Sequence, residues 1–74
     1  MRLLQMKQNE MAIVDAINLD QAVKVRLAAM GFTKESRICV KHYGWFKSTV
    51  QVMINRSLIA LRKEEAEHIE VHRV

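Results

Sequence analysis

The sequence predicts a mainly β fold, a small barrel of five or six short strands with one inserted α-helix near residues 19–30. Two segments, 37–42 and 49–54, alternate polar and apolar side chains as half-buried strands do. Only residues 19–30 carry apolar side chains at helical spacing. The 74 residues include no proline, two glycines and no repeat, so we expect a single domain over residues 1–74. Several short strands around one helix are typical of a small barrel.

The first seventeen residues predict two strands joined by a turn. Residues 3–7 are expected to form a short strand. It ends at residues 8–10, where Asn9 can take the left-handed conformation at less cost than most residues. Residues 11–17 predict a second strand. Their apolar run does not alternate cleanly, so the inward face of this strand stays undetermined.

Residues 19–30 predict the α-helix because their apolar side chains recur on one helical face. These side chains belong to Ala22, Val23, Leu27 and Met30. Asp20 favours the positive N-terminal end of a helix. Gly31 stands where a helix-ending residue takes positive φ, and Phe32 can fold back onto Leu27 as an apolar clasp. The helix is therefore expected to stop at Gly31.

An antiparallel meander is predicted after the helix. In the strands at 37–42 and 49–54 the inward side chains are expected to be Ile38, Val40, Val50, Val52 and Ile54. Residues 43–48 connect these strands, and residues 55–57 form a tight turn into a further strand at 58–61.

The end of the chain predicts two short elements. A helical turn near residues 62–67 is expected to pack Ala66 inward. Ile69 and Val71 then supply a last strand.

Composition limits the compartment and the kind of partner. The net charge is +4, and residues 21–63 hold nine Lys or Arg and one acid, Glu35. These cations either are scattered on the surface or form one basic face. No apolar run has the length of a membrane span, and the single cysteine, Cys39, can form no internal disulfide. We therefore expect a cytoplasmic protein.

No catalytic or metal-binding pattern is found, so we expect a protein that is not an enzyme and needs no cofactor. The two glycines, Gly31 and Gly44, are too far apart for a phosphate-binding loop. His68 and His72 would lie about 13 Å apart on a strand that rises roughly 3.3 Å per residue. Cys39 and His42, three apart on one strand, are expected to point to opposite faces. No metal site is predicted.

Partner contacts are the remaining candidate function. The candidate residues are Arg26, Leu27, Met30 and Phe32 near the helix end, with Tyr43, Trp45 and Lys47 in the connection. Trp and Tyr often anchor interfaces. The alternative is that one or two of Tyr43, Trp45 and Phe46 close the barrel end, and that Leu27, Met30 and Phe32 belong to the core. A groove between the helix and neighbouring strands would receive a partner helix or terminus.

Two segments carry a resemblance to a known family. Residues 26–32 read R-L-A-A-M-G-F, and residues 59–71 read I-A-L-R-K-E-E-A-E-H-I-E-V. They resemble the helix end "R-L-x-x-L/M-G-hydrophobic" and the closing "I-A-L-R-x-x-x-A-x-x-I-x-V" of the ferrous iron transport protein A (FeoA) family. Two positions depart from its pattern, since Lys34-Glu35 replaces a usual Pro-Gly and Asn9 replaces a usual Gly.

This resemblance implies a fold and a role. The fold is an SH3-like barrel, and the role is support of ferrous iron uptake by association with the cytoplasmic GTPase region of the membrane transporter FeoB, which places the domain indirectly near the membrane. Iron-dependent repressors of the DtxR type carry a similar C-terminal domain, so a detached regulatory domain is one alternative. A small basic barrel that binds nucleic acid through Tyr43, Trp45 and Phe46 is another. The resemblance favours the transporter partner, and no nucleic acid is expected.

Overall fold

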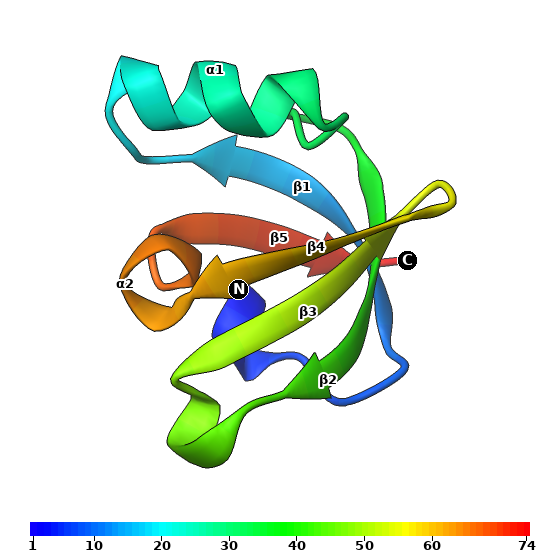
Figure 1. The fold of residues 1–74 in the computed structure, drawn as a ribbon. Helices are drawn as coiled ribbons and strands as arrows, with labels where there is room; N and C mark the ends of the chain where they lie inside the picture. Colours follow the sequence, from blue (N-terminus) through cyan, green and yellow to red (C-terminus); the bar gives the residue numbers. More distant parts are fainter.

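The computed structural model describes residues 1–74 and shows five antiparallel strands in one curled sheet of order β4-β3-β2-β1-β5 (Figure 1). The strands are β1 (Met11–Ile17), β2 (Arg37–Tyr43), β3 (Thr49–Ile54), β4 (Ser57–Arg62) and β5 (Ile69–Arg73). The helices are α1 (Gln21–Ala29) and α2 (Lys63–Ala66), with single 3₁₀ turns η1 (Leu3–Gln5) and η2 (Trp45–Lys47). Neither α-helix is long and apolar enough to cross a membrane.

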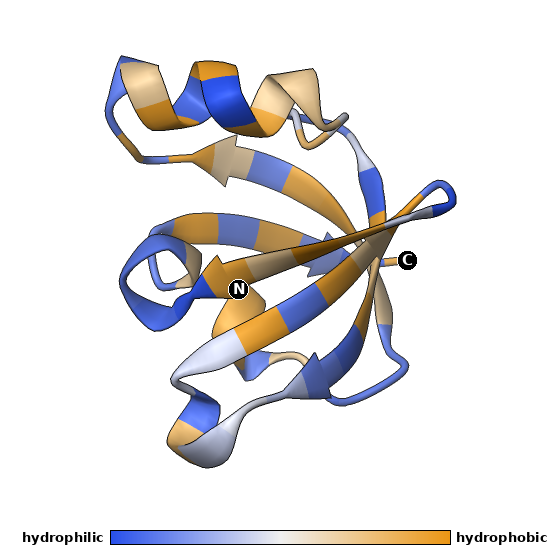
Figure 2. Ribbon diagram, in the orientation of Figure 1, coloured by the Kyte–Doolittle hydropathy of each residue, from blue (hydrophilic) through white to orange (hydrophobic).

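All seventeen buried residues are apolar, and they form one cluster inside the curled sheet. The alternation that predicted two half-buried strands is visible along β3 (Figure 2). The inward positions predicted for β2 and β3 are confirmed, because all five are buried: Ile38, Val40, Val50, Val52 and Ile54. Ala66, Ile69 and Val71 are buried as predicted.

A bulge at Asp15 explains why the inward face of β1 could not be predicted. The pairing of β1 with β5 shifts between Val14 and Ala16, so Asp15 is an extra residue. Ala12 and Val14 are buried before the bulge, and Ile17 is buried after it. Because an extra residue changes which alternate side chains face inward, the sequence shows no single alternation.

A second bulge, at Lys41 in β2, corrects the predicted placement of Cys39 and His42. The register with β3 shifts between Val40 and His42, so His42 lies opposite Gln51 and Tyr43 lies opposite the buried Val50. His42 therefore shares the outer face with Cys39. The prediction that these two side chains point to opposite faces is wrong, because it assumed an unbroken strand.

The predicted strand at residues 3–7 is also wrong. The segment forms η1, and Leu3 and Met6 are both fully buried. Side chains three apart lie on the same side of a 3₁₀ turn, whereas on a strand they point to opposite faces. Burying both residues at one end of the barrel therefore favours the turn. A single bridge between Arg2 and Glu70 holds the segment beside β5.

The stop of α1 has the predicted geometry. Gly31 has φ of 89°, its N–H donates to the carbonyl of Ala28 at 2.9 Å, and the N–H of Phe32 donates to the carbonyl of Leu27 at 2.9 Å. These are the two bonds of a Schellman motif. Leu27 and Phe32 are both fully buried, which makes the apolar clasp part of the core.

The two turns that depart from the FeoA pattern keep a left-handed residue. Asn9 has φ of 67° and Glu35 has φ of 73°. Asparagine tolerates this conformation better than other residues with a Cβ, whereas glutamate has no such advantage. Glu35 therefore holds a conformation that glycine adopts at lower cost.

Replacing Glu35 by glycine is expected to stabilise the domain. The left-handed conformation costs a non-glycine residue roughly 1–2 kcal/mol, and glycine's extra chain entropy offsets roughly 0.5–1 kcal/mol of the gain. Glu35→Gly should therefore raise the free energy of unfolding in urea by about 0.5–1 kcal/mol. Glu35→Ala, which keeps the Cβ, should give no gain. Equal effects of the two variants would contradict this account.

Candidate docking surfaces

Helix α1 lies on the outside of the barrel as a ridge with little of its surface covered (Figure 1). Only Leu27 is fully buried, and Val23 packs partly against the core. Ala22 and Met30, predicted to share the inward face, are exposed. Val25 is 58% exposed, because it lies about 200° around the helix from Leu27 at 3.6 residues per turn. The helix therefore presents apolar side chains to solvent.

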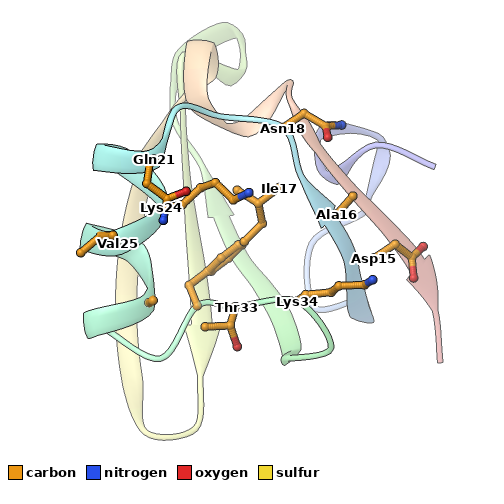
Figure 3. A pocket seen from close by; sticks show the side chains of 11 residues that line it. Asp15, Ala16, Ile17, Asn18, Gln21, Lys24, Val25, Thr33 and Lys34 are labelled. Carbon is orange, nitrogen blue, oxygen red and sulfur yellow. The ribbon is translucent and has the colours of Figure 1, made fainter.

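A groove of about 380 Å³ separates α1 from β1, and we call it the α1–β1 groove (Figure 3). Gln21 and Lys24 extend from the helix toward Ile17 on β1 (Figure 3). Eleven residues line the groove: Asp15, Ala16, Ile17, Asn18, Gln21, Lys24, Val25, Ala28, Phe32, Thr33 and Lys34. Its partly apolar wall and its two lysines could hold an apolar segment that carries carboxylates.

The carboxylate of Asp15 at the groove edge is already engaged. Its Oδ1 lies 2.5 Å from Nδ1 of His72 on β5. The two lysines that line the groove, Lys24 and Lys34, form no ion pair. The groove therefore presents unpaired positive charge to a partner.

On its other side, α1 borders a shallow depression of about 750 Å³ against β4 and α2. Arg26 on α1 forms an ion pair with Glu65 of α2 across this depression. Burial alone would raise the pKa of Glu65, but the backbone N–H of Arg62 and the guanidinium of Arg26 outweigh it and lower the pKa below 4.5. Arg26 thus links α1 to α2, and its own side chain stays exposed.

The 3₁₀ turn η2 and its flanking residues lie at the opposite end of the molecule from α1 (Figure 1). Residues 44–48, here called the aromatic tip, carry Trp45 and Phe46 with exposed fractions of 85% and 93%. Tyr43, which directly precedes the tip, packs against the core, whereas Trp45 and Phe46 do not. The candidate partner residues predicted from sequence therefore form two separate surfaces.

Burial removes two of those candidates. Leu27 and Phe32 are fully buried, so they belong to the core even though Phe32 is among the residues that line the groove. Arg26 and Met30 remain on the exposed ridge, and Trp45 and Lys47 on the aromatic tip. Reasoning from sequence missed Val25, although its place opposite Leu27 on the helical wheel was available as a signal.

Tyr43 fixes the base of the aromatic tip. Its hydroxyl donates to the carbonyl of Met6 at 2.6 Å and lies 3.4 Å from that of Leu3, which joins β2 to η1. Burial, and then the charge of Glu10, raise the pKa of Tyr43 above 10.0. The phenol therefore keeps its proton and stays a donor at neutral pH. Nζ of Lys47 lies 4.7 Å from the centre of the Tyr43 ring and donates to the carbonyl of Leu4 at 2.7 Å.

No three His, Cys, Asp or Glu side chains gather in a group that could hold a metal ion. The closest pairs are the contact of His72 with Asp15 and a 4.0 Å approach of His68 to Glu67.

Comparison with known families fits these observations. The FeoA domain profile matches residues 1–73. The chain belongs to the FeoA family. A putative Fe(2+) transport protein A of Helicobacter pylori is 36% identical over 59 residues, which cover 80% of this chain and 78% of the relative. One from Campylobacter jejuni is 32% identical over 72 residues, 97% of each chain. The FeoA family takes part in Fe²⁺ transport.

Solved structures support the same fold. The solution structure of the FeoA protein from Chlorobium tepidum matches with a TM-score of 0.93 and 28% identity, over 100% of this chain and 70% of that one. This confirms the predicted SH3-like fold of the FeoA family. A manganese-dependent transcriptional repressor matches with a TM-score of 0.88 at 21% identity, and this chain spans 41% of its length. That likeness shows the fold alone.

Removing the Tyr43 hydroxyl is expected to loosen η1. Tyr43→Phe leaves the partly buried carbonyl of Met6 without its donor, which should lower the free energy of unfolding by about 1 kcal/mol. Amide exchange at Met6, whose N–H donates to Leu3 within η1, should become faster. Urea unfolding and hydrogen exchange measure the two effects. Unchanged stability would mean that water satisfies these carbonyls equally well.

Proposed function

We propose that this FeoA-family domain is a cytoplasmic accessory protein that docks onto the GTPase region of the ferrous iron transporter FeoB and modulates it by contact alone. Membership of an Fe²⁺ transport family supports the transporter as partner. The observation that carries the docking is the α1–β1 groove, where the exposed Val25 of α1 lies beside Lys24 and Lys34.

The chemistry of this surface indicates the kind of segment that would bind. Val25 is 58% exposed at the groove, and covering it would remove apolar area from water. Lys24 and Lys34 lie at the groove without acidic partners. An amphipathic helix or a chain terminus with carboxylates beside its apolar face would satisfy both features.

The packing of α1 also suits a docking element. Within the helix only Leu27 is fully buried, so small shifts of α1 would disturb little of the core. The ion pair between Arg26 and Glu65 and the Schellman clasp keep the helix in place before a partner arrives. A partner segment would therefore meet a formed but adaptable surface.

The test is an NMR titration of the ¹⁵N-labelled domain with the isolated GTPase region, without lipid. Shifts should cluster on residues 21–30 and on the groove. Val25→Glu should weaken binding by about tenfold, because the loss of one buried aliphatic contact and a repelled charge exceed about 1.4 kcal/mol. Met11→Glu is the matched control, since Met11 is 46% exposed at the far end of β1.

Two outcomes would contradict the proposal. The first is a titration without shifts at high partner concentration. The second is a set of shifts confined to the aromatic tip, with Val25→Glu and Met11→Glu behaving alike.

Nucleic-acid binding is the second candidate, and the exposed rings of Trp45 and Phe46 favour it because bases stack on such rings. Filter binding with single-stranded DNA and RNA at two salt concentrations tests it, since affinity for phosphates falls steeply as salt rises. If the filter retains no DNA or RNA with the domain at low salt, nucleic-acid binding is excluded.

A further inference from the structure

The aromatic tip exposes the two largest apolar side chains of the surface at one place. Trp45 and Phe46 are 85% and 93% exposed, more than any other large apolar residue. Their ring centres lie 6.3 Å apart with the planes inclined by 50°, so the two rings form one small projecting cluster. Leaving both rings in water is costly for a folded domain, which marks the tip as a contact site.

The backbone holds the rings in this exposed position. Phe46 and Lys47 have φ of 53° and 56°, a left-handed conformation that is unfavourable for residues with a Cβ. The N–H of Lys47 donates to the carbonyl of Gly44 at 3.0 Å, and that of Ser48 donates to Trp45 at 2.9 Å. A Cβ on Gly44 would come within 2.3 Å of the Thr49 hydroxyl. The tip is thus a fixed and strained projection, a feature common at binding sites.

Cations surround the base of the tip. Lys47 belongs to it, the N–H of Lys63 donates to the carbonyl of Ser48 at 2.9 Å, and Arg62 pairs with Thr49 at the neighbouring strand position. Residues 44–48 contain no carboxylate. Among the nearest acids, Glu64 is exposed next to Lys63, whereas Glu65 is paired with Arg26, and Glu10, whose charge acts on Tyr43, is paired with Arg73. The balance at this end of the domain is positive.

An anionic lipid bilayer matches this combination better than a protein pocket does. Trp and Phe rings enter the boundary between headgroups and acyl chains, and nearby Lys and Arg are attracted to anionic headgroups. The tip projects from the domain and its two rings are almost fully exposed. It can therefore enter the deformable headgroup region of a bilayer, which needs no preformed cavity. We propose that the domain inserts Trp45 and Phe46 into the interface of an anionic membrane.

This contact is independent of the proposed docking through α1. The helix and the tip lie at opposite ends of the molecule (Figure 1), so α1 stays accessible when the tip meets a bilayer. Lipid binding can therefore be measured with the domain alone, and its failure would leave the titration with the GTPase region unaffected.

The sequence provides a direct probe, because Trp45 is the only tryptophan. Its fluorescence is measured with vesicles of phosphatidylcholine and with vesicles of phosphatidylcholine and phosphatidylglycerol in equal parts. The unmodified domain should show a blue shift with the mixed vesicles, and lipids brominated along the acyl chain should quench the emission. Binding to pure phosphatidylcholine should be much weaker.

Two variants that should weaken vesicle binding and one control variant complete the test. Phe46→Gly removes one ring while glycine accepts the positive φ, and it should weaken partition into mixed vesicles by about tenfold. Lys63→Glu should weaken partition by roughly tenfold through the reversed charge. Met11→Thr, which alters an exposed apolar side chain on β1, should bind as the unmodified domain does. Circular dichroism checks that each variant is folded.

Several results would overturn the proposal. One is the absence of a blue shift and of quenching in the unmodified domain. A second is binding that Lys63→Glu abolishes and Phe46→Gly leaves unchanged, which would show surface attraction without insertion. A third is a blue shift with single-stranded nucleic acid or with the GTPase region but not with vesicles, which would assign the tip to that partner.

Discussion

Two β-bulges determine which side chains enter the barrel, and both candidate surfaces depend on them. The extra residue Asp15 turns β1 so that Ile17 faces the interior and also lines the α1–β1 groove. The extra residue Lys41 turns β2 so that Tyr43 faces inward and bonds to η1. Each bulge adds twist to its strand, which helps a short sheet to curl over an entirely apolar core. Without them, unbroken alternation would place Ala16 in β1 and His42 in β2 inward instead of Ile17 and Tyr43.

The region between β1 and β2 is held by few contacts. Leu27 and Phe32 are the two fully buried side chains between Ile17 and Ile38, and the Schellman bonds join their backbones directly. The ion pair of Arg26 with Glu65 adds little stability, because the arginine side chain is 58% exposed. Local opening is therefore expected to cost less at α1 than in the sheet. The same sparse packing leaves Val25 and Met30 uncovered.

The sequence was sufficient for the regular parts of the fold and insufficient where the register changes. Strict alternation predicted β2 and β3, and the Gly31–Phe32 pair predicted the helix end. In contrast, β1 has no constant alternation because of the bulge at Asp15, and residues 3–7 have the apolar composition of a strand while they form a 3₁₀ turn. Aromatic composition also could not separate Tyr43, which packs inward, from Trp45 and Phe46. That difference arises from the bulge at Lys41 and from left-handed backbone, which depend on tertiary structure.

Charge pairing differs between the acids and the lysines of this domain. The acids Glu10, Asp15, Glu65 and Glu67 contact Arg73, His72, Arg26 and His68 respectively. None of the lysines forms an ion pair. Four of the eight acids thus have a partner within the domain, and two of these partners are histidines, while Lys24 and Lys34 at the groove and Lys63 beside the tip have no carboxylate partner. Some of the cations consequently lie near exposed apolar side chains, with Lys24 and Lys34 at the groove beside Val25 and Lys63 beside the aromatic tip. Such an arrangement suits a domain that meets two acidic partners at once, with the barrel fixing the distance between them.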